Sequence, residues 1–420
     1  MAQIKRAIME LSITSTSTVA VAPPAGQPVA ATGKQVAAGM LRLAFIDNIR
    51  WVMIILVVSM HAAVTYSHLG SWYFMENTPV SKPEVFVFGT YQAWLQSFFM
   101  GFLFFIAGYF VPKAYDTKGA GKFLRDRAVR LGLPLLVFVF ILQPVSVWCI
   151  YLFDRPGLDI SFGQLYSNYL RSGRWIGGTG PLWFCEALLL FCVGYTLCRL
   201  AGRWFVLPVR TREGLSVPRN RTIWGLVAVL AGLSFVVRIP WPNGTSFYNL
   251  QFCYFSQYVL FFCVGTLAYR GDWLRQFTVA TGNYWLRAAL IGGMALWLGN
   301  IVLGGALQGE FAAYQGGWHW QSLIECCREQ LAGVGLSLFL LVWFRERFNR
   351  QGAVARFFSA NAFAVYVFHA PVLIALGKCL TRWHGPLLVK FVALTALAVG
   401  LTYLLSALVL RRTPLLKKIL

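Results

Sequence analysis

Ten separate apolar stretches run through this chain, and each meets or approaches the length of about 20 residues that a helix needs to cross a bilayer. Their approximate limits are 44–66, 88–112, 131–153, 181–200, 222–239, 250–269, 284–306, 320–344, 358–378 and 387–410. Nothing between them is large enough to bury a core of its own. The sequence therefore predicts an all-α polytopic membrane protein, a bundle of about ten transmembrane helices.

The distribution of charge predicts how the chain crosses the bilayer. The net charge is +22, but the basic residues form short clusters between apolar runs, without a motif that reads or stacks on bases, so we expect no nucleic acid partner. With a cytosolic N-terminus, 26 of the 37 Lys and Arg fall in cytosolic segments and 6 in the opposite loops. Cationic loops resist translocation, so both termini are predicted to be cytosolic.

Three segments follow from this topology. Residues 1–43 include Ser-Thr-Ala-Pro stretches without the continuous apolar core of a signal peptide and are predicted to be a disordered cytoplasmic tail. Residues 44–411 form the transmembrane domain, and 412–420 form a short basic cytoplasmic tail. The nine cysteines lie mostly inside apolar runs and lack metal-ligand spacing, so we predict no metal site.

Placing an ionisable residue inside a span costs several kcal/mol, so each one needs an explanation. The first span carries three. On a helix, Arg50 and His61 point within about 20° of one direction, and Asp47 lies within about 40° of His61. Arg50 and His61 are separated by about 16 Å along the axis. This face therefore links the cytosolic interface to a polar point beyond mid-membrane.

Two interpretations stay open for His61 and for Arg50. His61 is either a structural histidine bonded to a neighbouring helix or a general base, because neutral imidazole can take a hydroxyl proton near pH 7. Arg50 either extends its charged end to the inner interface or binds a ligand. The shared face favours the functional interpretation.

The inner end of the third span reads Arg125-Asp-Arg-Ala-Val-Arg130. Arg127 and Arg130 are three residues apart and share a helix face, so their planar donor groups can match phosphate oxygens. Ordinary positive-inside topology is the alternative explanation of a basic loop.

Carboxylates occur in two further spans. Glu186 follows Trp183 in Gly180-Pro-Leu-Trp-Phe-Cys-Glu, in the outer half of the fourth span. Glu325, Arg328 and Glu329 lie near the start of the eighth span on one helix face. An ion pair between Arg328 and either glutamate is the simpler interpretation there, and it leaves one carboxylate without a role.

The ninth span contains Tyr366-Val-Phe-His369-Ala-Pro371. Tyr366 and His369 share a face near mid-membrane, and Pro371 can free a backbone carbonyl beside them. A structural hydrogen bond is the expected role of His369.

Together these segments resemble the acyltransferase-3 family of bacterial integral membrane acyltransferases, whose members acylate O-antigens, glucans, Nod factors and other glycans. The resemblance runs from about residue 44 to 410. Arg50, ten intervening residues and His61, preceded by Asp47, look like the family's opening-helix signature. Arg127 and Arg130 match its paired arginines.

Two later motifs add to the resemblance. The segment around Trp183 is similar to the family's fourth-helix pattern, with Pro181 where histidine is common, and Tyr366 to Pro371 looks like its Tyr-x-x-His-x-Pro pattern. Four motifs in order, with matching topology, are far more specific than any one of them.

The resemblance implies an acyl-CoA donor substrate, no permanently bound cofactor, a catalytic role for His61, and a multi-pass protein of the bacterial inner membrane. We expect Arg127, Arg130 and Arg50 to hold the CoA phosphates. Glu186 or Glu325 would orient the imidazole or bind hydroxyls of a carbohydrate or glycolipid acceptor. Asp47, Trp183, Arg328, Tyr366 and His369 would support the site. The alternative is a transporter or flippase that uses the buried His, Glu and Arg residues.

Overall fold

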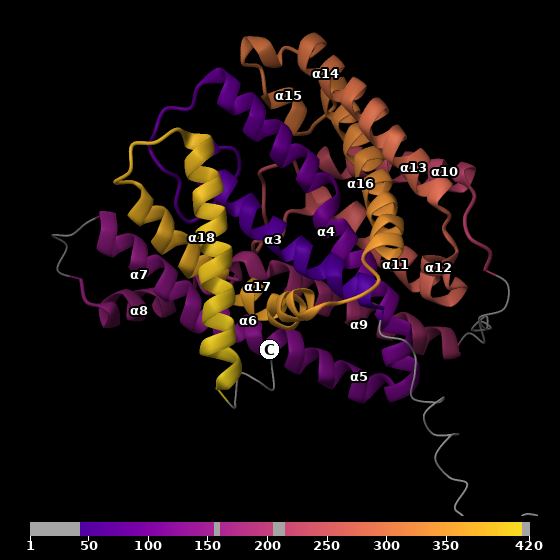
Figure 1. Ribbon diagram of the computed structural model, residues 1–420, viewed down its shortest axis with the longest axis horizontal. Coiled ribbons are helices and arrows are strands. Elements are labelled where there is room, and N and C mark those ends of the chain that lie inside the picture. Colours follow the sequence, from indigo (N-terminus) through magenta and orange to yellow (C-terminus); the bar gives the residue numbers. More distant parts are fainter. Residues whose placement is uncertain (1–42, 155–159, 205–214, 414–420) are drawn as a thin grey trace, which may run out of the picture. The chain divides into compact units, whose positions relative to one another are not determined.

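The computed structural model describes residues 43–154, 160–204 and 215–413. Within them, ten helices are long and apolar enough to cross a membrane, as predicted (Figure 1). These spans are Ala44–Ser67, Lys82–Lys118, Ala120–Asp154, Gly180–Gly202, Asn220–Arg238, Phe252–Gly271, Val279–Leu303, Trp320–Arg347, Ala353–Leu380 and Leu387–Arg412. The predicted disordered tail up to residue 42 and the last seven residues lie outside the described ranges.

The described helices include short segments as well as spans. Their bounds are α3 (Ala44–Ser67), α4 (Lys82–Lys118), α5 (Ala120–Arg127), α6 (Leu133–Val137), α7 (Gln143–Asp154), α8 (Phe162–Arg171), α9 (Trp183–Trp204), α10 (Asn220–Arg238), α11 (Phe255–Gly271), α12 (Trp273–Gln276), α13 (Val279–Arg287), α14 (Gly293–Leu303), α15 (Ala312–Gln315), α16 (Trp320–Arg347), α17 (Ala353–Leu380) and α18 (Leu387–Leu408).

The third span is not one regular helix. Its segments α5, α6 and α7 are joined by π-helical turns at Ala128–Gly132 and Phe138–Leu142. A π-turn closes its hydrogen bond one residue later than an α-turn, so each turn adds one residue and re-aims the side chains that follow. The span also begins at Ala120, eleven residues before the predicted limit, because α5 extends the helix through the basic segment.

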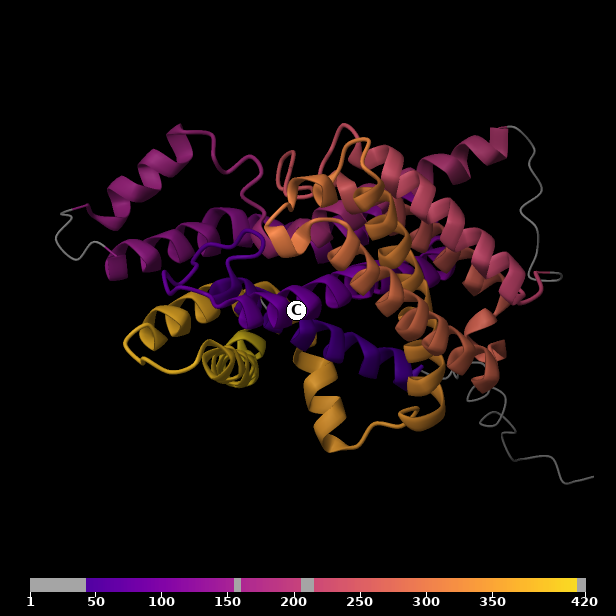
Figure 2. The same ribbon diagram turned by 90° about the horizontal axis from the view of Figure 1, so that it is seen from above.

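Helix α3 lies at the centre of the packing. It contacts α4, α16, α17 and α18, and Figure 2 shows it between α4 and the C-terminal helices α17 and α18. In its most apolar window, 67% of residues are buried within the protein, compared with 17% in the span Val279–Leu303. The helix with three ionisable residues is therefore among the least exposed to lipid.

Glycines allow a close approach of α4 and α11. A Cβ atom on Gly108 would lie 2.2 Å from the Phe262 carbonyl oxygen, and one on Gly265 would lie 2.2 Å from the Phe105 carbonyl oxygen. Small residues at such crossings let backbones meet, which compensates for the missing hydrophobic driving force between helices in lipid.

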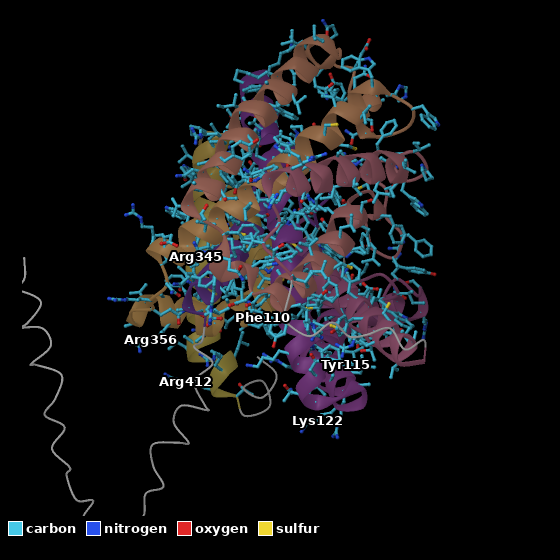
Figure 3. All side chains as sticks on the ribbon, turned by 90° about the vertical axis from the view of Figure 1, so that its right-hand side faces the viewer. Phe110, Tyr115, Lys122, Arg345, Arg356 and Arg412 are labelled. Atoms are coloured by element: carbon cyan, nitrogen blue, oxygen red, sulfur yellow. The ribbon has the colours of Figure 1, made fainter. Side chains whose placement is uncertain are left out.

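Basic residues of the predicted cytosolic loops gather toward one end of the bundle. Figure 3 shows Lys122, Arg356 and Arg412 in the same part of the view as Phe110 and Tyr115. This placement agrees with the alternation predicted from the charges. Which side of the membrane that end faces remains a prediction.

Candidate functional site

Three aromatic rings meet where the end of α3, the following loop and α17 come together. The imidazole of His61 stacks on the indole of Trp72, with ring centroids 3.9 Å apart and planes 16° from parallel. The ring centroid of His369, on α17, lies 5.5 Å from that of His61, and the two ring planes are 15° from parallel. The histidines predicted from two separate motifs therefore form one cluster, and its third member comes from a loop.

Hydrogen bonding fixes the orientation of His369. Its Nδ1 lies 2.8 Å from the backbone oxygen of Tyr366. Because a carbonyl only accepts, Nδ1 carries the proton and donates, which leaves Nε2 as an acceptor in the neutral ring. That Nε2 is buried without a partner, and so is the donor Nε1 of Trp72. A buried unpaired polar atom is costly, and here two of them surround His61.

The Tyr366 hydroxyl ties this cluster to the start of the fourth span, because it donates to the backbone oxygen of Pro181. Trp183, two residues further on, stacks on Tyr258 with ring centroids 5.5 Å apart. Proline stands where the family pattern often has histidine, and its carbonyl is the group that contacts α17. Tyr366 and Trp183 thus position helices around the cluster.

The other end of the α3 face is a basic surface. Arg50 donates to Asp47 over 3.3 Å, and its guanidinium lies 4.7 Å from the ring centroid of Phe110. Phe110 also lines a cavity of about 320 Å³. The full lining is Phe110, Lys113, Ala114, Thr117, Lys118, Phe123, Asp126, Arg127 and Arg130.

Arg127 and Arg130 both line this cavity, as their spacing predicted for a shared face. The π-turn that begins at Ala128 lies between them. Arg127 also lies 5.3 Å from the ring centroid of Phe123, which holds the guanidinium against an aromatic wall. Lys113 adds a further positive charge, while Lys118 is paired with Asp126 of the same lining. The lining therefore suits an anion that carries an aromatic or apolar group.

The carboxylates of the eighth span are held in ion pairs. Glu325 accepts two hydrogen bonds from Arg328, at 2.9 and 2.5 Å, and Arg328 also donates to Ser97 on α4 at 3.0 Å. Glu329 pairs with Arg238 of α10 at 2.5 Å, with both side chains buried. The carboxylate that the sequence left without a role therefore has an arginine partner that sequence spacing did not indicate.

Glu186 lies beside the start of its helix. One of its oxygens is buried without a hydrogen-bond partner. No hydrogen bond or ion pair among the described residues joins Glu186 or Glu325 to His61. No direct contact therefore supports their predicted role in orienting the imidazole. Within the same residues, no group of three or more His, Cys, Asp and Glu side chains is placed to hold a metal ion.

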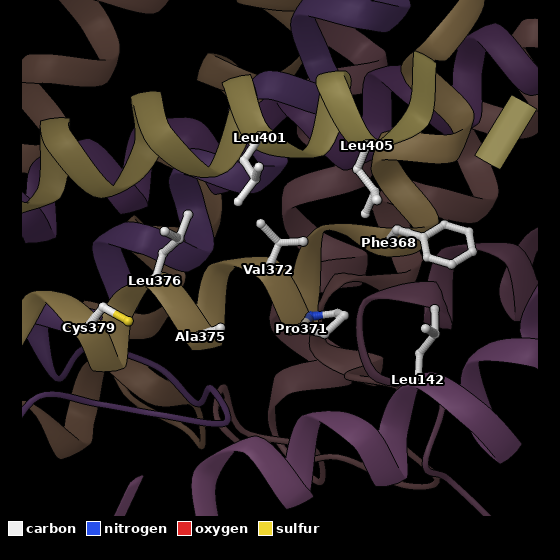
Figure 4. Close-up of a pocket in the computed structure, with 9 residues that line it drawn as sticks. All are labelled: Leu142, Phe368, Pro371, Val372, Ala375, Leu376, Cys379, Leu401 and Leu405. Atoms are coloured by element: carbon white, nitrogen blue, oxygen red, sulfur yellow. The ribbon is translucent and has the colours of Figure 1, made fainter. Parts of the chain in front are cut away.

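A second cavity of about 400 Å³ lies on the other flank of α17 (Figure 4). Its lining is Leu142, Phe368, Pro371, Val372, Ala375, Leu376, Cys379, Leu401 and Leu405. Phe368 and Pro371 flank His369 in sequence, but the lining offers only apolar groups and one thiol. This cavity lacks the polar groups that acyl transfer needs.

Comparison with known proteins identifies the class. The model of a family described as "Acyltransferase domain" matches residues 43–408. The protein is thus a membrane-embedded acyltransferase, an enzyme that transfers acyl groups other than amino-acyl groups to oxygen. The chain belongs to the acyltransferase-3 family, which confirms the resemblance seen in its motifs.

Curated relatives agree over nearly the full length. Proteins named "Glucans biosynthesis protein C" from Salmonella paratyphi B, Salmonella enteritidis and Salmonella choleraesuis are each 23% identical over 390 residues. The alignments cover 89% of this chain and 93% of each relative. No solved structure matches the chain.

Proposed function

We propose that this acyltransferase of the bacterial inner membrane takes an acyl group, by default acetyl and alternatively succinyl, from acyl-CoA and passes it to a hydroxyl of a cell-envelope or exported carbohydrate. One observation supports this most strongly. A single buried helix, α3, carries at one end an arginine against the wall of a basic cavity and near the other a histidine within a ring cluster.

The basic cavity is the proposed donor site. CoA carries several phosphates and an adenine ring, and the cavity offers two arginines, two lysines and the faces of Phe110 and Phe123. Arginine binds phosphate oxygens through paired donors, and aromatic faces suit a flat base. Arg127, Arg130 and Arg50 would hold the phosphates, while the pantetheine arm reaches along α3 toward His61, about 16 Å away.

His61 is the proposed general base. Its neutral imidazole takes the proton of the acceptor hydroxyl as the oxygen attacks the thioester carbonyl. A carbon–oxygen bond then forms, the carbon–sulfur bond breaks, and the leaving thiolate receives the proton from the imidazolium. His369, whose Nδ1 is tied to the Tyr366 carbonyl, holds a fixed tautomer beside it. In this proposal the acyl group passes from sulfur to the acceptor oxygen in one step.

A carbohydrate acceptor is proposed from the relatives, whose name refers to glucan biosynthesis. Glu186, with one buried oxygen unpaired, would accept a hydrogen bond from a sugar hydroxyl. Glu325 is less suited to this task because Arg328 occupies both of its oxygens. The alternative, a transporter or flippase, would use buried charges such as Glu325 and Arg328, and these two side chains are held in an ion pair with each other.

The test is acyl transfer by the purified protein. Labelled acetyl-CoA and succinyl-CoA would be offered with membrane glycans as acceptor, using His61→Ala as the inactive variant and His319→Ala, an exposed histidine elsewhere, as the matched control. We expect label in glycan with wild type and His319→Ala only. Equal labelling by His61→Ala would contradict the assignment of the base, and a lack of donor binding would contradict the acyl-CoA site.

A further inference from the structure

The loop between α3 and α4 carries Trp72, which places an indole flat against the proposed catalytic imidazole. The contact covers one face of His61, so the ring cannot turn without moving the indole. Trp72 makes no hydrogen bond through its Nε1, which is buried. Its position is therefore set by the loop around it rather than by a bond of its own.

Three contacts join the loop to helices α4, α7 and α17. Near its beginning, the Leu69 carbonyl accepts a hydrogen bond from Gln92 of α4. Beside the indole, the Tyr73 hydroxyl donates to Gln143 of α7, and burial raises the pKa of Tyr73, which keeps this donor protonated. Lys378 of α17 lies 3.7 Å from the ring centroid of Phe74.

The deepest fastening is an ion pair. Glu76 Oε1 and Lys390 Nζ of α18 lie 2.5 Å apart, with side-chain exposures of 9% and 2%. The backbone of Glu76 is also held, because its N–H donates to the Thr65 carbonyl at 2.8 Å and its oxygen accepts from His68 Nε2 at 2.5 Å. Burying such a pair is expensive, and the proposed chemistry at His61 does not use its charges.

We infer that Trp72 is a positioning residue of the acyl transfer, which holds the His61 ring in its reactive orientation and forms the wall past which the acceptor reaches it. The Glu76–Lys390 ion pair anchors the loop that carries this wall. This inference rests on the proposed function, because it assigns His61 to the reaction. It adds a loop residue outside the four motifs and gives the buried pair a purpose.

The geometry can be tested without activity. Diethyl pyrocarbonate modifies accessible imidazoles, and mass spectrometry reports the rate for each histidine. In Trp72→Ala we expect faster modification of His61 than in wild type, with His319 as the internal reference. Trp72→Phe, which keeps a flat ring, should resemble wild type. Trp318→Ala removes a tryptophan that is 79% exposed and should leave the His61 rate unchanged.

Kinetics test the positioning. Trp72→Ala should lower kcat on the order of 100-fold, since a small displacement of a catalytic group has effects of this size, while the donor KM stays within about twofold. Trp72→Phe should recover most of kcat. Lys390→Met should raise His61 modification and lower kcat, and Glu76→Gln/Lys390→Met should regain thermal stability without regaining kcat.

Two results would overturn the inference: an unchanged His61 modification rate in Trp72→Ala, or a kcat for that variant close to wild type. A double variant that regains both stability and kcat would show that the ion pair does not position Trp72. Wild-type protein that neither binds nor uses any acyl-CoA would instead contradict the proposed function, while the modification rates would still report whether Trp72 covers His61.

Discussion

Two groups of buried polar side chains, one around Arg328 and Arg238 and one around His61, are completed in different ways. Around Arg328 and Arg238, each charge meets an opposite charge, and Gln330 adds a bond to Glu329 at 3.0 Å. Around His61 the rings touch face to face, yet Nε2 of His369 and Nε1 of Trp72 have no partner. Paired charges hold helices together, whereas a ring cluster with unpaired nitrogens can receive a substrate. This contrast agrees with the proposal that the first group is scaffold and the second is the reaction site.

The sharpest way to break this comparison is His61→Ala. Loss of a general base should lower kcat on the order of 10²- to 10⁴-fold, while the thermal midpoint in detergent stays near wild type. Acyl transfer and thermal unfolding of the same preparation would measure both. A large loss of stability with little loss of kcat would place His61 in the scaffold.

The reverse pattern is expected for Arg328→Met. Removing one partner leaves the Glu325 carboxylate uncompensated in the membrane interior, with a cost of about 3–5 kcal/mol in unfolding free energy. Thermal unfolding should show a large drop, while the folded fraction keeps a kcat similar to wild type. A kcat that falls by more than the folded fraction would show that this ion-pair network contributes to catalysis.

A third variant tests whether the basic cavity binds the donor. Arg127→Ala removes a charge-assisted hydrogen bond to phosphate, so the donor KM should rise about tenfold with kcat and the acceptor KM little changed. Lys122→Ala, a nearby basic residue that does not line the cavity, is the matched control. Equal effects in both variants would indicate general attraction of the anion.

The smallest effect is expected for Glu186→Gln. It retains a hydrogen-bonding oxygen but loses the charge, so the acceptor KM should rise a few-fold, as expected for about 1 kcal/mol of binding. Steady-state kinetics with varied acceptor would measure it. A drop in kcat as large as that of His61→Ala would make Glu186 part of the proton-transfer step.

The spans and part of the candidate site could be predicted from the sequence because the bilayer restricts the structures that a chain can form within it. Length and hydropathy predict the ten spans, and periodicity places Arg50 and His61 on one helix face. The motifs predict that Arg127 shares a helix face with Arg130 and that His369 shares one with Tyr366, because spacing along a helix determines which side chains are neighbours.

Contacts between distant segments were not predictable in the same way. Trp72 lies in a loop, and the spacing of residues in a loop does not indicate which ring the indole will cover. The partners Glu329 and Arg238 are 91 positions apart, and Glu76 and Lys390 are 314 apart. Such pairings depend on how helices pack, and a single sequence carries no direct record of that.

The two π-turns of the third span have a consequence for how such proteins tolerate insertions and deletions. Each turn holds one residue more than an α-turn. The five residues of a π-turn turn through about the same angle as four residues of an α-helix, so deleting one residue from a turn would leave a regular helix whose flanks keep nearly their present orientation. Deleting one residue elsewhere in the span would instead rotate one flank against the other by about 100°. Arg127 would then no longer face the same direction relative to Gln143, the partner of Tyr73. The two π-turns are therefore the places where this span should best tolerate a single-residue deletion.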